Sequence, residues 1–125
     1  MASLLRVDIE TAAGSVLAQL GDAHYSESVL QTALTVELQL HGYCVQTEVT
    51  FPVQYETSVG TLVTVGQVRV DILVTNTVDP SAMAVIEVKK TNAGNHTAQL
   101  TRYKRVLPEN AFIALFSPSG LVWHP

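Results

Sequence analysis

RVDILV (residues 69–74) and AVIEVKK (84–90) are two short apolar runs that each contain one carboxylate, and polar residues separate them. Both runs are rich in β-branched residues, and runs of this length and composition are typical of β-strands. We interpret them as two strands joined by a loop through Asn76–Ser81. The sequence therefore predicts a strand pair at the centre of the fold.

The charged side chains of these two strands are predicted to meet in one pocket. Side chains alternate between the faces of a strand, so Glu87 and Lys89 lie on one face and Val88 on the other. If the strands pair, Asp71 sits beside Glu87. Neighbouring carboxylates repel unless a cation lies between them, and a hard divalent cation prefers oxygen ligands. In such a pocket Lys89 would orient or deprotonate an attacking water, or stabilise negative charge on a phosphate.

A simpler interpretation of the same residues is a solvated strand face that carries ordinary charges. An aspartate followed by a Glu-x-Lys sequence occurs by chance in many chains. The composition argues against chance, because only 14% of the residues are charged, yet three charged residues stand together within hydrophobic strands. The setting therefore favours a functional site.

The composition predicts one domain that spans residues 1–125. Hydrophobic residues make up 47% of the chain, but no apolar run reaches the roughly 18 residues of a membrane-spanning helix. The N-terminus, MASLLRVDIE, lacks the apolar centre of a signal peptide, and Cys44 is the only cysteine, so no internal disulfide is possible. We expect an intracellular domain, cytoplasmic or nuclear. The charge-poor, apolar composition also favours a homodimer.

The charges are divided unevenly along the chain. Residues 1–68 carry seven acidic and one basic side chain, a net charge of −6, whereas residues 69–125 carry four acidic and six basic side chains, a net charge of +2. The overall charge of −4 is unusual for a protein that binds nucleic acid, since phosphate contacts normally supply much of the affinity. Because nearly all positive charge surrounds the candidate pocket, we expect modest, salt-sensitive binding there.

Two helices are predicted in the first third of the chain. Residues 3–20 place apolar side chains at helical spacing, and Gly21 follows as a natural stop. Ser26 is a suitable N-cap for a second helix that runs to about His41. Glu27 falls in the first turn of that helix, where a carboxylate interacts favourably with the helix dipole. Its simplest role is therefore structural.

A meander of strands is predicted to follow. Residues 43–55 alternate between apolar and polar side chains, which predicts a strand with one solvated face. Pro52 indicates an edge strand or a bulge at that point. Two further strands, 61–65 and 69–75, are expected on either side of Gly66, and the short connections favour antiparallel pairing.

The last third of the chain predicts a helix and a final buried strand. Residues 91–95 are rich in turn-forming residues, and a helix follows from about His96 to Leu107. Residues 111–116 form a compact apolar run, and the order of helix then strand indicates a crossover onto the sheet. Residues 117–125 are expected to form a tail. The four histidines lack the spacing of metal ligands, so no zinc site is expected.

The order of these elements resembles the PD-(D/E)XK nuclease superfamily and, within it, the small GxxExxY proteins. The resemblance extends from about Val7 to Phe116. It rests on six segments in the family's order, which are Ala12-Ala13 in the first helix, ESVLQTAL (27–34), FPVQY (51–55), RVDILV (69–74), VIEVKK (85–90) and HTAQLTRY (96–103). It implies an α/β, restriction-endonuclease-like core, in which helices flank a mixed sheet of about four to five strands in the order α-α-β-β-β-α-β.

The resemblance also implies a chemistry for the pocket. Asp71 and Glu87 would bind Mg²⁺, or Mn²⁺ as a substitute, together with the backbone carbonyl of Val88. Lys89 would assist the attacking water, and Glu27 would add a carboxylate from the second helix, directly or through water. The reaction would be hydrolysis of a phosphodiester bond.

The resemblance assigns two further residues on the last helix. Gln99 would support the site, and Tyr103 would pack behind Gln99. The name-giving GxxExxY motif is broken here. His24 stands where its glycine would be if Glu27 is its glutamate, and Leu30 replaces its tyrosine. This departure concerns the placement in a subfamily more than the chemistry, because Asp71 and its partners are intact.

Two functional hypotheses follow from the sequence. The first is a metal-dependent nuclease that acts on DNA, with structured or branched DNA conceivable, as a homodimer or guided by a larger protein partner. The second is a catalytically silent nucleic-acid-binding, protein-binding or assembly domain that retains the fold, which the net acidity supports. Residues expected to contact nucleic acid are Arg69, Lys90, His96, Arg102, Tyr103, Lys104 and Arg105.

Overall fold

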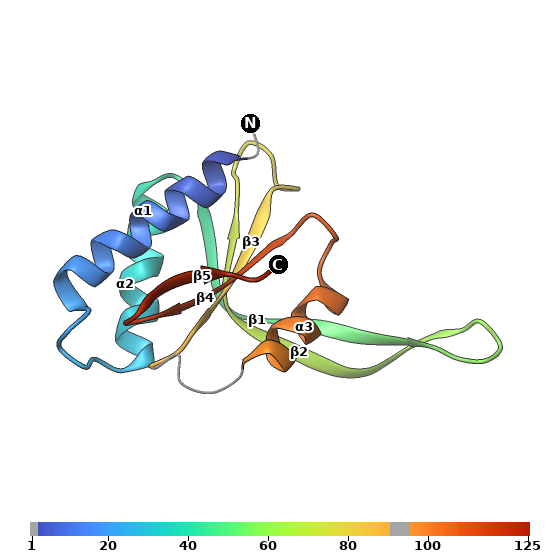
Figure 1. Cartoon of the computed structure of the whole chain (residues 1–125). Coiled ribbons are helices and arrows are strands. Elements are labelled where there is room, and N and C mark those ends of the chain that lie inside the picture. The colour runs from blue at the N-terminus through green and yellow to red at the C-terminus, as the bar shows by residue number, and fades with distance from the viewer. Residues whose placement is uncertain (1–2, 91–95) are drawn as a thin grey trace.

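The computed structural model describes residues 3–90 and 96–125, which form three helices and a five-stranded mixed sheet (Figure 1). The elements in chain order are α1 (Ser3–Leu20), α2 (Glu27–Leu40), β1 (Cys44–Glu56), β2 (Leu62–Thr75), β3 (Met83–Val88), α3 (Thr97–Val106), β4 (Phe112–Ser117) and β5 (Gly120–Trp123). The predicted α/β class, with a mixed sheet of up to five strands flanked by helices, is confirmed.

The strands lie in the sheet in the same order as in the chain, β1-β2-β3-β4-β5. The pairs β1–β2, β2–β3 and β4–β5 are antiparallel, and β3 pairs with β4 in parallel. A parallel pair requires a crossover connection, and α3 supplies it. The crossover predicted from the order of helix then strand is therefore confirmed. The predicted turn at residues 91–95 lies outside the residues that the structure describes.

Helices cover both faces of the sheet. On one face, α1 and α2 pack on a row of buried side chains that runs across the strands, in which Ile72 pairs with Ile86 and Ile86 with Ala114. On the other face, α3 buries Leu100 and Tyr103 against the sheet. Side chains alternate between the faces of a strand, so β3 supplies Ile86 and Val88 to the layer under α1 and α2, and Val85 and Glu87 to the layer under α3.

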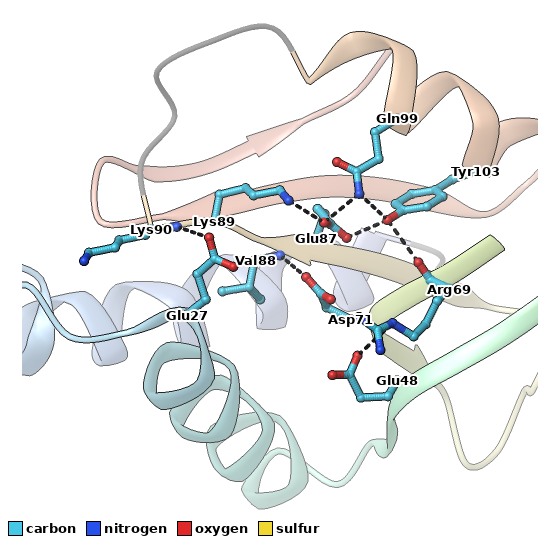
Figure 2. A network of polar contacts seen from close by, with 10 residues as sticks. All are labelled: Glu27, Glu48, Arg69, Asp71, Glu87, Val88, Lys89, Lys90, Gln99 and Tyr103. Atoms are coloured by element: carbon cyan, nitrogen blue, oxygen red, sulfur yellow. Dashed lines mark hydrogen bonds and ion pairs between the residues drawn. The ribbon is translucent and has the colours of Figure 1, made fainter.

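The ends of α2 agree with the sequence. The Ser26 side chain accepts a hydrogen bond from the Val29 backbone N–H, as expected of an N-cap, and His41 is the C-cap. The predicted apolar stripe buries Leu30, Leu34 and Leu38. The N-terminal end of α2 directs Glu27 toward the carboxyl end of β3 (Figure 2).

Two predicted element boundaries were wrong. Residues 61–65 and 69–75 are not separate strands, because β2 is continuous across Gly66, which pairs with Val53. The edge strand or bulge predicted at Pro52 is confirmed, because β1 is an edge strand and its register shifts between Val53 and Gln54. The hairpin of β1 and β2 is consequently long, and its far end projects beyond α3 (Figure 1).

The predicted tail at 117–125 was also wrong, since it contains β5, which pairs with β4. Trp123 fixes this strand to the first helix. Its indole N–H donates a hydrogen bond of 3.1 Å to Glu10, and the Arg6 guanidinium lies 4.7 Å from the centroid of its ring. Glu10 and Arg6 lie more than a hundred positions away in the chain, whereas the pairing with β4 is local and runs through a two-residue turn at Pro118 and Ser119.

Within the part of the chain that the structure describes, no helix combines the length and apolar character needed to cross a bilayer.

Candidate active site

The candidate site lies where β2 and β3 meet beneath α3 (Figure 2). Ile72 pairs with Ile86, so continuing the antiparallel register by one residue sets Asp71 beside Glu87. The two carboxylates interact electrostatically, and the charge of Glu87 acts to raise the pKa of Asp71. The predicted juxtaposition of Asp71 and Glu87 is therefore present in the structure.

Three donors hold the carboxylate of Glu87, whose residue is only 3% exposed. The Tyr103 hydroxyl donates to Oε1 at 2.6 Å, and the Gln99 side-chain amide donates to Oε2 at 2.9 Å. The Lys89 ammonium lies 3.1 Å from Oε2. Charge-assisted hydrogen bonds of this kind offset much of the cost of burying a carboxylate. Glu87 is thus fixed in position by its own strand and by α3.

Asp71 is held less completely. Its Oδ2 accepts a hydrogen bond of 2.8 Å from the backbone N–H of Val88. The pKa of Asp71 is raised to about 6, because burial and, to a smaller extent, the neighbouring Glu87 carboxylate outweigh the lowering effects of the Val88 hydrogen bond and of Lys89. The unfavourable charge at Asp71 is what a bound cation would relieve.

Lys89 carries the positive charge of the site. Although burial acts to lower the pKa of Lys89, its hydrogen bond and attraction to Glu87, with smaller contributions from Glu27 and Asp71, leave that pKa above its ordinary value. The ammonium is therefore protonated at neutral pH. In this arrangement it is suited to orient a water or an anionic group rather than to remove a proton.

Glu27 approaches from the first turn of α2. Its Oε2 accepts a hydrogen bond of 2.8 Å from the backbone N–H of Lys90, and its charge also acts on Lys89. The structure thus brings Glu27 to the end of β3 but does not join its carboxylate to those of Asp71 and Glu87 (Figure 2). Across residues 3–90 and 96–125, no group of three or more His, Cys, Asp or Glu side chains is arranged to hold a metal.

The donor chemistry at the site nevertheless fits a hard divalent cation. Asp71 and Glu87 offer carboxylate oxygens side by side, and the pKa of Asp71 is raised first by its burial and then by the neighbouring charge of Glu87. The carbonyl of Val88 is a further oxygen on the strand between Glu87 and Lys89. Oxygen-only sets of this kind suit Mg²⁺ and Mn²⁺.

The predicted residues of α3 contribute in different ways. Tyr103 was expected to pack behind Gln99, but its hydroxyl also contacts Glu87 directly and accepts a hydrogen bond from Gln99. Burial, followed by the hydrogen bond to Glu87, raises the pKa of Tyr103 well above its usual range, so the hydroxyl remains a donor. His96 precedes the helix, and its Nε2 is buried with no hydrogen-bond partner among the described residues.

The basic residues predicted to contact nucleic acid have different surroundings in the structure. The Arg69 guanidinium is 3.6 Å from the Glu48 carboxylate, and the Lys104 ammonium donates a hydrogen bond to the carbonyl of Pro125. Arg102 and Arg105 line a hollow between α3 and the β1–β2 hairpin. Lys90 is exposed beside the site, and its backbone is bound by Glu27.

Glu48 lies beside the site, and no motif in the sequence singles it out. This residue lies within β1 at the position opposite Asp71, and its backbone has a φ of +56°, in the left-handed region that non-glycine residues seldom adopt. The distortion interrupts the regular pairing at this point and leaves the Glu48 carboxylate beside Arg69. No residue pattern signals it, because the local sequence TEVTF is that of an ordinary strand.

One comparison with known proteins gave a match that covers the residues of this site. A family model described as the PD-(D/E)XK nuclease superfamily matches residues 4–113, which include both helices before the sheet, the two carboxylates and α3. No curated protein and no solved structure gave a significant match.

Replacing Asp71 with asparagine should stabilise the protein at neutral pH in EDTA. Asparagine can still accept the Val88 hydrogen bond but adds no charge beside Glu87. The folded pKa of about 6 lies above the unfolded value of 3.8, so this carboxyl costs stability as the pH rises between them. We expect a gain of about 1–2 kcal/mol, discounted because the group is half-buried. Urea unfolding measures it.

The gain should shrink as the pH falls from about 6 toward 3.8, because the wild-type carboxyl then becomes neutral. Asp22→Asn is the control, since Asp22 is exposed in the connection between α1 and α2. A destabilised Asp71→Asn at neutral pH, or a gain that does not change with pH, would contradict the electrostatic account of the pair.

Replacing Tyr103 with phenylalanine should destabilise the protein by about 1–3 kcal/mol, because the buried Glu87 loses a charge-assisted donor. Tyr55→Phe is a matched control, since Tyr55 is 57% exposed and the same substitution there removes no hydrogen bond within the described residues. Denaturant unfolding of both variants gives the comparison. Equal, small effects would show that the hydroxyl of Tyr103 is not needed to hold Glu87.

Proposed function

This chain belongs to the PD-(D/E)XK nuclease superfamily, and on that premise we propose that it is a Mg²⁺-dependent endonuclease that hydrolyses phosphodiester bonds in DNA. The observation that carries the proposal is the pair of carboxylates, Asp71 and Glu87, on adjacent strands with Lys89 at 3.1 Å from Glu87. Two negative groups and one positive group in a half-buried pocket match the needs of phosphodiester hydrolysis.

In this proposal Asp71, Glu87 and the backbone carbonyl of Val88 would hold Mg²⁺, or Mn²⁺ in its place, with Glu27 contributing directly or through a water. When bound, the cation supplies Lewis-acid activation of the phosphate and neutralises the charge of the carboxylates. Gln99 and Tyr103 hold Glu87 in a fixed orientation by donating to its two oxygens. They act as positioning residues.

Lys89 would assist the reaction through its charge. Its ammonium is anchored on Glu87 and is protonated at neutral pH, so it can orient the attacking water and stabilise negative charge that builds on the phosphate. Such charge stabilisation is strong in a pocket shielded from water, and Lys89 is partly buried. The lysine therefore contributes most in the transition state.

We further propose that the protein acts as a homodimer, so that two sites meet a duplex or a branched junction. The positive charge of the second half of the chain supplies a modest attraction for phosphates. Few basic residues in this domain are available to read base sequence, which favours cutting guided by DNA structure or by a partner.

One observation favours a catalytically silent binding or assembly domain instead. The carboxylate of Glu27 is engaged by the Lys90 backbone, and within the described residues no third acidic side chain joins Asp71 and Glu87. This alternative retains the fold and the two carboxylates without metal-dependent chemistry. Metal binding and cleavage distinguish the two functions.

Cleavage is the direct test. Purified protein should cut at least one of labelled linear, nicked, single-stranded or four-way DNA in Mg²⁺ or Mn²⁺, and cut none in EDTA. Lys89→Ala should reduce the rate by about 10²–10³-fold, the usual effect of losing a group that stabilises charge in the transition state. Arg6→Ala is the charge-matched control, because Arg6 stacks on Trp123 away from the site, and it should cleave like the wild type. RNA in parallel lanes tests the preference for DNA.

Metal binding gives an independent prediction. At a Mn²⁺ concentration of about 100 times Kd, wild-type protein should gain about 2.7 kcal/mol of stability, visible as a higher Tm. The gain should disappear in Asp71→Asn and in Glu87→Gln, because each removes a carboxylate ligand. If wild-type protein neither gains stability from Mn²⁺ nor cleaves any substrate, the nuclease proposal fails and the silent binding domain replaces it.

A further inference from the structure

The far half of the β1–β2 hairpin and α3 enclose a groove beside the candidate site. One part of it, of about 460 Å³, lies between the hairpin and the outer face of α3. A second part, of about 360 Å³, shares Val53, Val65, Val68 and Arg102 with the first and continues to Gln99 and Tyr103, the two residues that hold Glu87. We call this continuous hollow the arm groove, after the hairpin that projects past α3 (Figure 1).

The charge of the arm groove is opposite to that of the whole chain. The protein has seven basic residues and a net charge of −4, yet three of the seven, Arg69, Arg102 and Arg105, line the groove. Neither an aspartate nor a glutamate is among its described lining residues. Arg102 and Arg105 form no ion pair with any described residue. A concave surface with unpaired arginines complements a polyanion.

The groove is also apolar, which a purely electrostatic site for phosphates does not require. Its floor is formed by valines of both strands, and at its rim the side chains of Tyr55 and Val65 are exposed by 57% and 61%. A DNA duplex hides its bases within the stack and presents phosphates and sugars. An unpaired strand exposes the flat, apolar faces of its bases, which stack on aromatic side chains.

We propose that the arm groove binds an unpaired DNA strand and leads it to the candidate site. The bases would lie on Tyr55 and the valine floor, and the phosphates would pair with Arg102 and Arg105. The strand is taken to be DNA because the proposed function is the hydrolysis of DNA. This inference rests on the proposed nuclease function for its biological meaning and deepens it by naming single-stranded segments as the substrate.

Binding in EDTA tests the groove separately from catalysis. Fluorescence anisotropy should show that the protein binds labelled oligothymidine more tightly than a duplex of the same length. Tyr55→Ala should weaken that binding by about 5- to 150-fold, the range that corresponds to the loss of one base stack. Tyr25→Ala is the matched control, since Tyr25 is also exposed, by 42%, but does not line the groove.

The contribution of the arginines to binding is tested by its dependence on salt concentration. Replacing Arg102 with glutamine should reduce the slope of log K against log salt by about 0.7, the value for one phosphate contact to a single strand. Arg6→Gln removes the same charge from α1, on the opposite face of the sheet, and should leave the slope unchanged. Val65→Glu, which places a carboxylate at the exposed rim, should weaken binding independently of Tyr55. Thermal unfolding of each variant confirms that it is folded.

The results separate this inference from the proposed function. Equal affinity for duplex and single strand, tighter binding of oligouridine, or equal effects of Tyr55→Ala and Tyr25→Ala would each overturn the groove assignment while leaving the cleavage test intact. Conversely, tight single-strand binding in EDTA that depends on Tyr55 and Arg102 supports the groove even if Lys89→Ala shows that cleavage has another origin.

Discussion

The burial of one carboxylate, that of Glu87, constrains the architecture around it. An ionised carboxylate that leaves water without partners costs several kcal/mol, so a 3% exposed glutamate demands donors. Its own strand supplies Lys89, and α3 supplies Gln99 and Tyr103. These α3 contacts fix the helix over the sheet, and the helix is also the crossover that lets β4 pair with β3 in parallel. The charge and the topology are therefore linked through the same helix.

The neighbouring Asp71, unlike Glu87, has few donors for its carboxylate. It has one backbone donor, lies beside a like charge, and has a pKa raised to about 6. Lys89 compensates only part of this negative charge, because its closest contact is with Glu87. A folded protein that keeps such an arrangement sacrifices stability at one point. The proposed cation would relieve this imbalance, so the residue that weakens the free protein would be the one that favours the metal-bound state.

Sequence patterns predicted most of the fold because they encode local burial. Alternation placed Glu87 on the face opposite Val88, and capping residues placed both ends of α2 within a residue. The errors arose where a local signal was weaker than a distant contact. Gly66 suggested a break, but pairing with Val53 carries β2 through it. The last strand was missed although its hairpin with β4 is local; only its contacts with α1 come from a distant part of the chain.

The residues of the candidate site also differ in whether local sequence or distant contacts determine their positions. The two carboxylates and Lys89 could be predicted, since strand register depends on residues close in the chain. The orientation of Glu27 and the left-handed backbone of Glu48 could not, because each is set by contacts with distant backbone or side chains. The arm groove was equally hidden, since its valines and its arginines come from strands and a helix far apart in sequence. The distribution of charge along the chain indicates the basic second half. Only the folded β1–β2 hairpin places its valines beside the arginines of α3. Chemistry at this site is thus encoded locally, whereas the surface that would select a substrate is encoded by the topology.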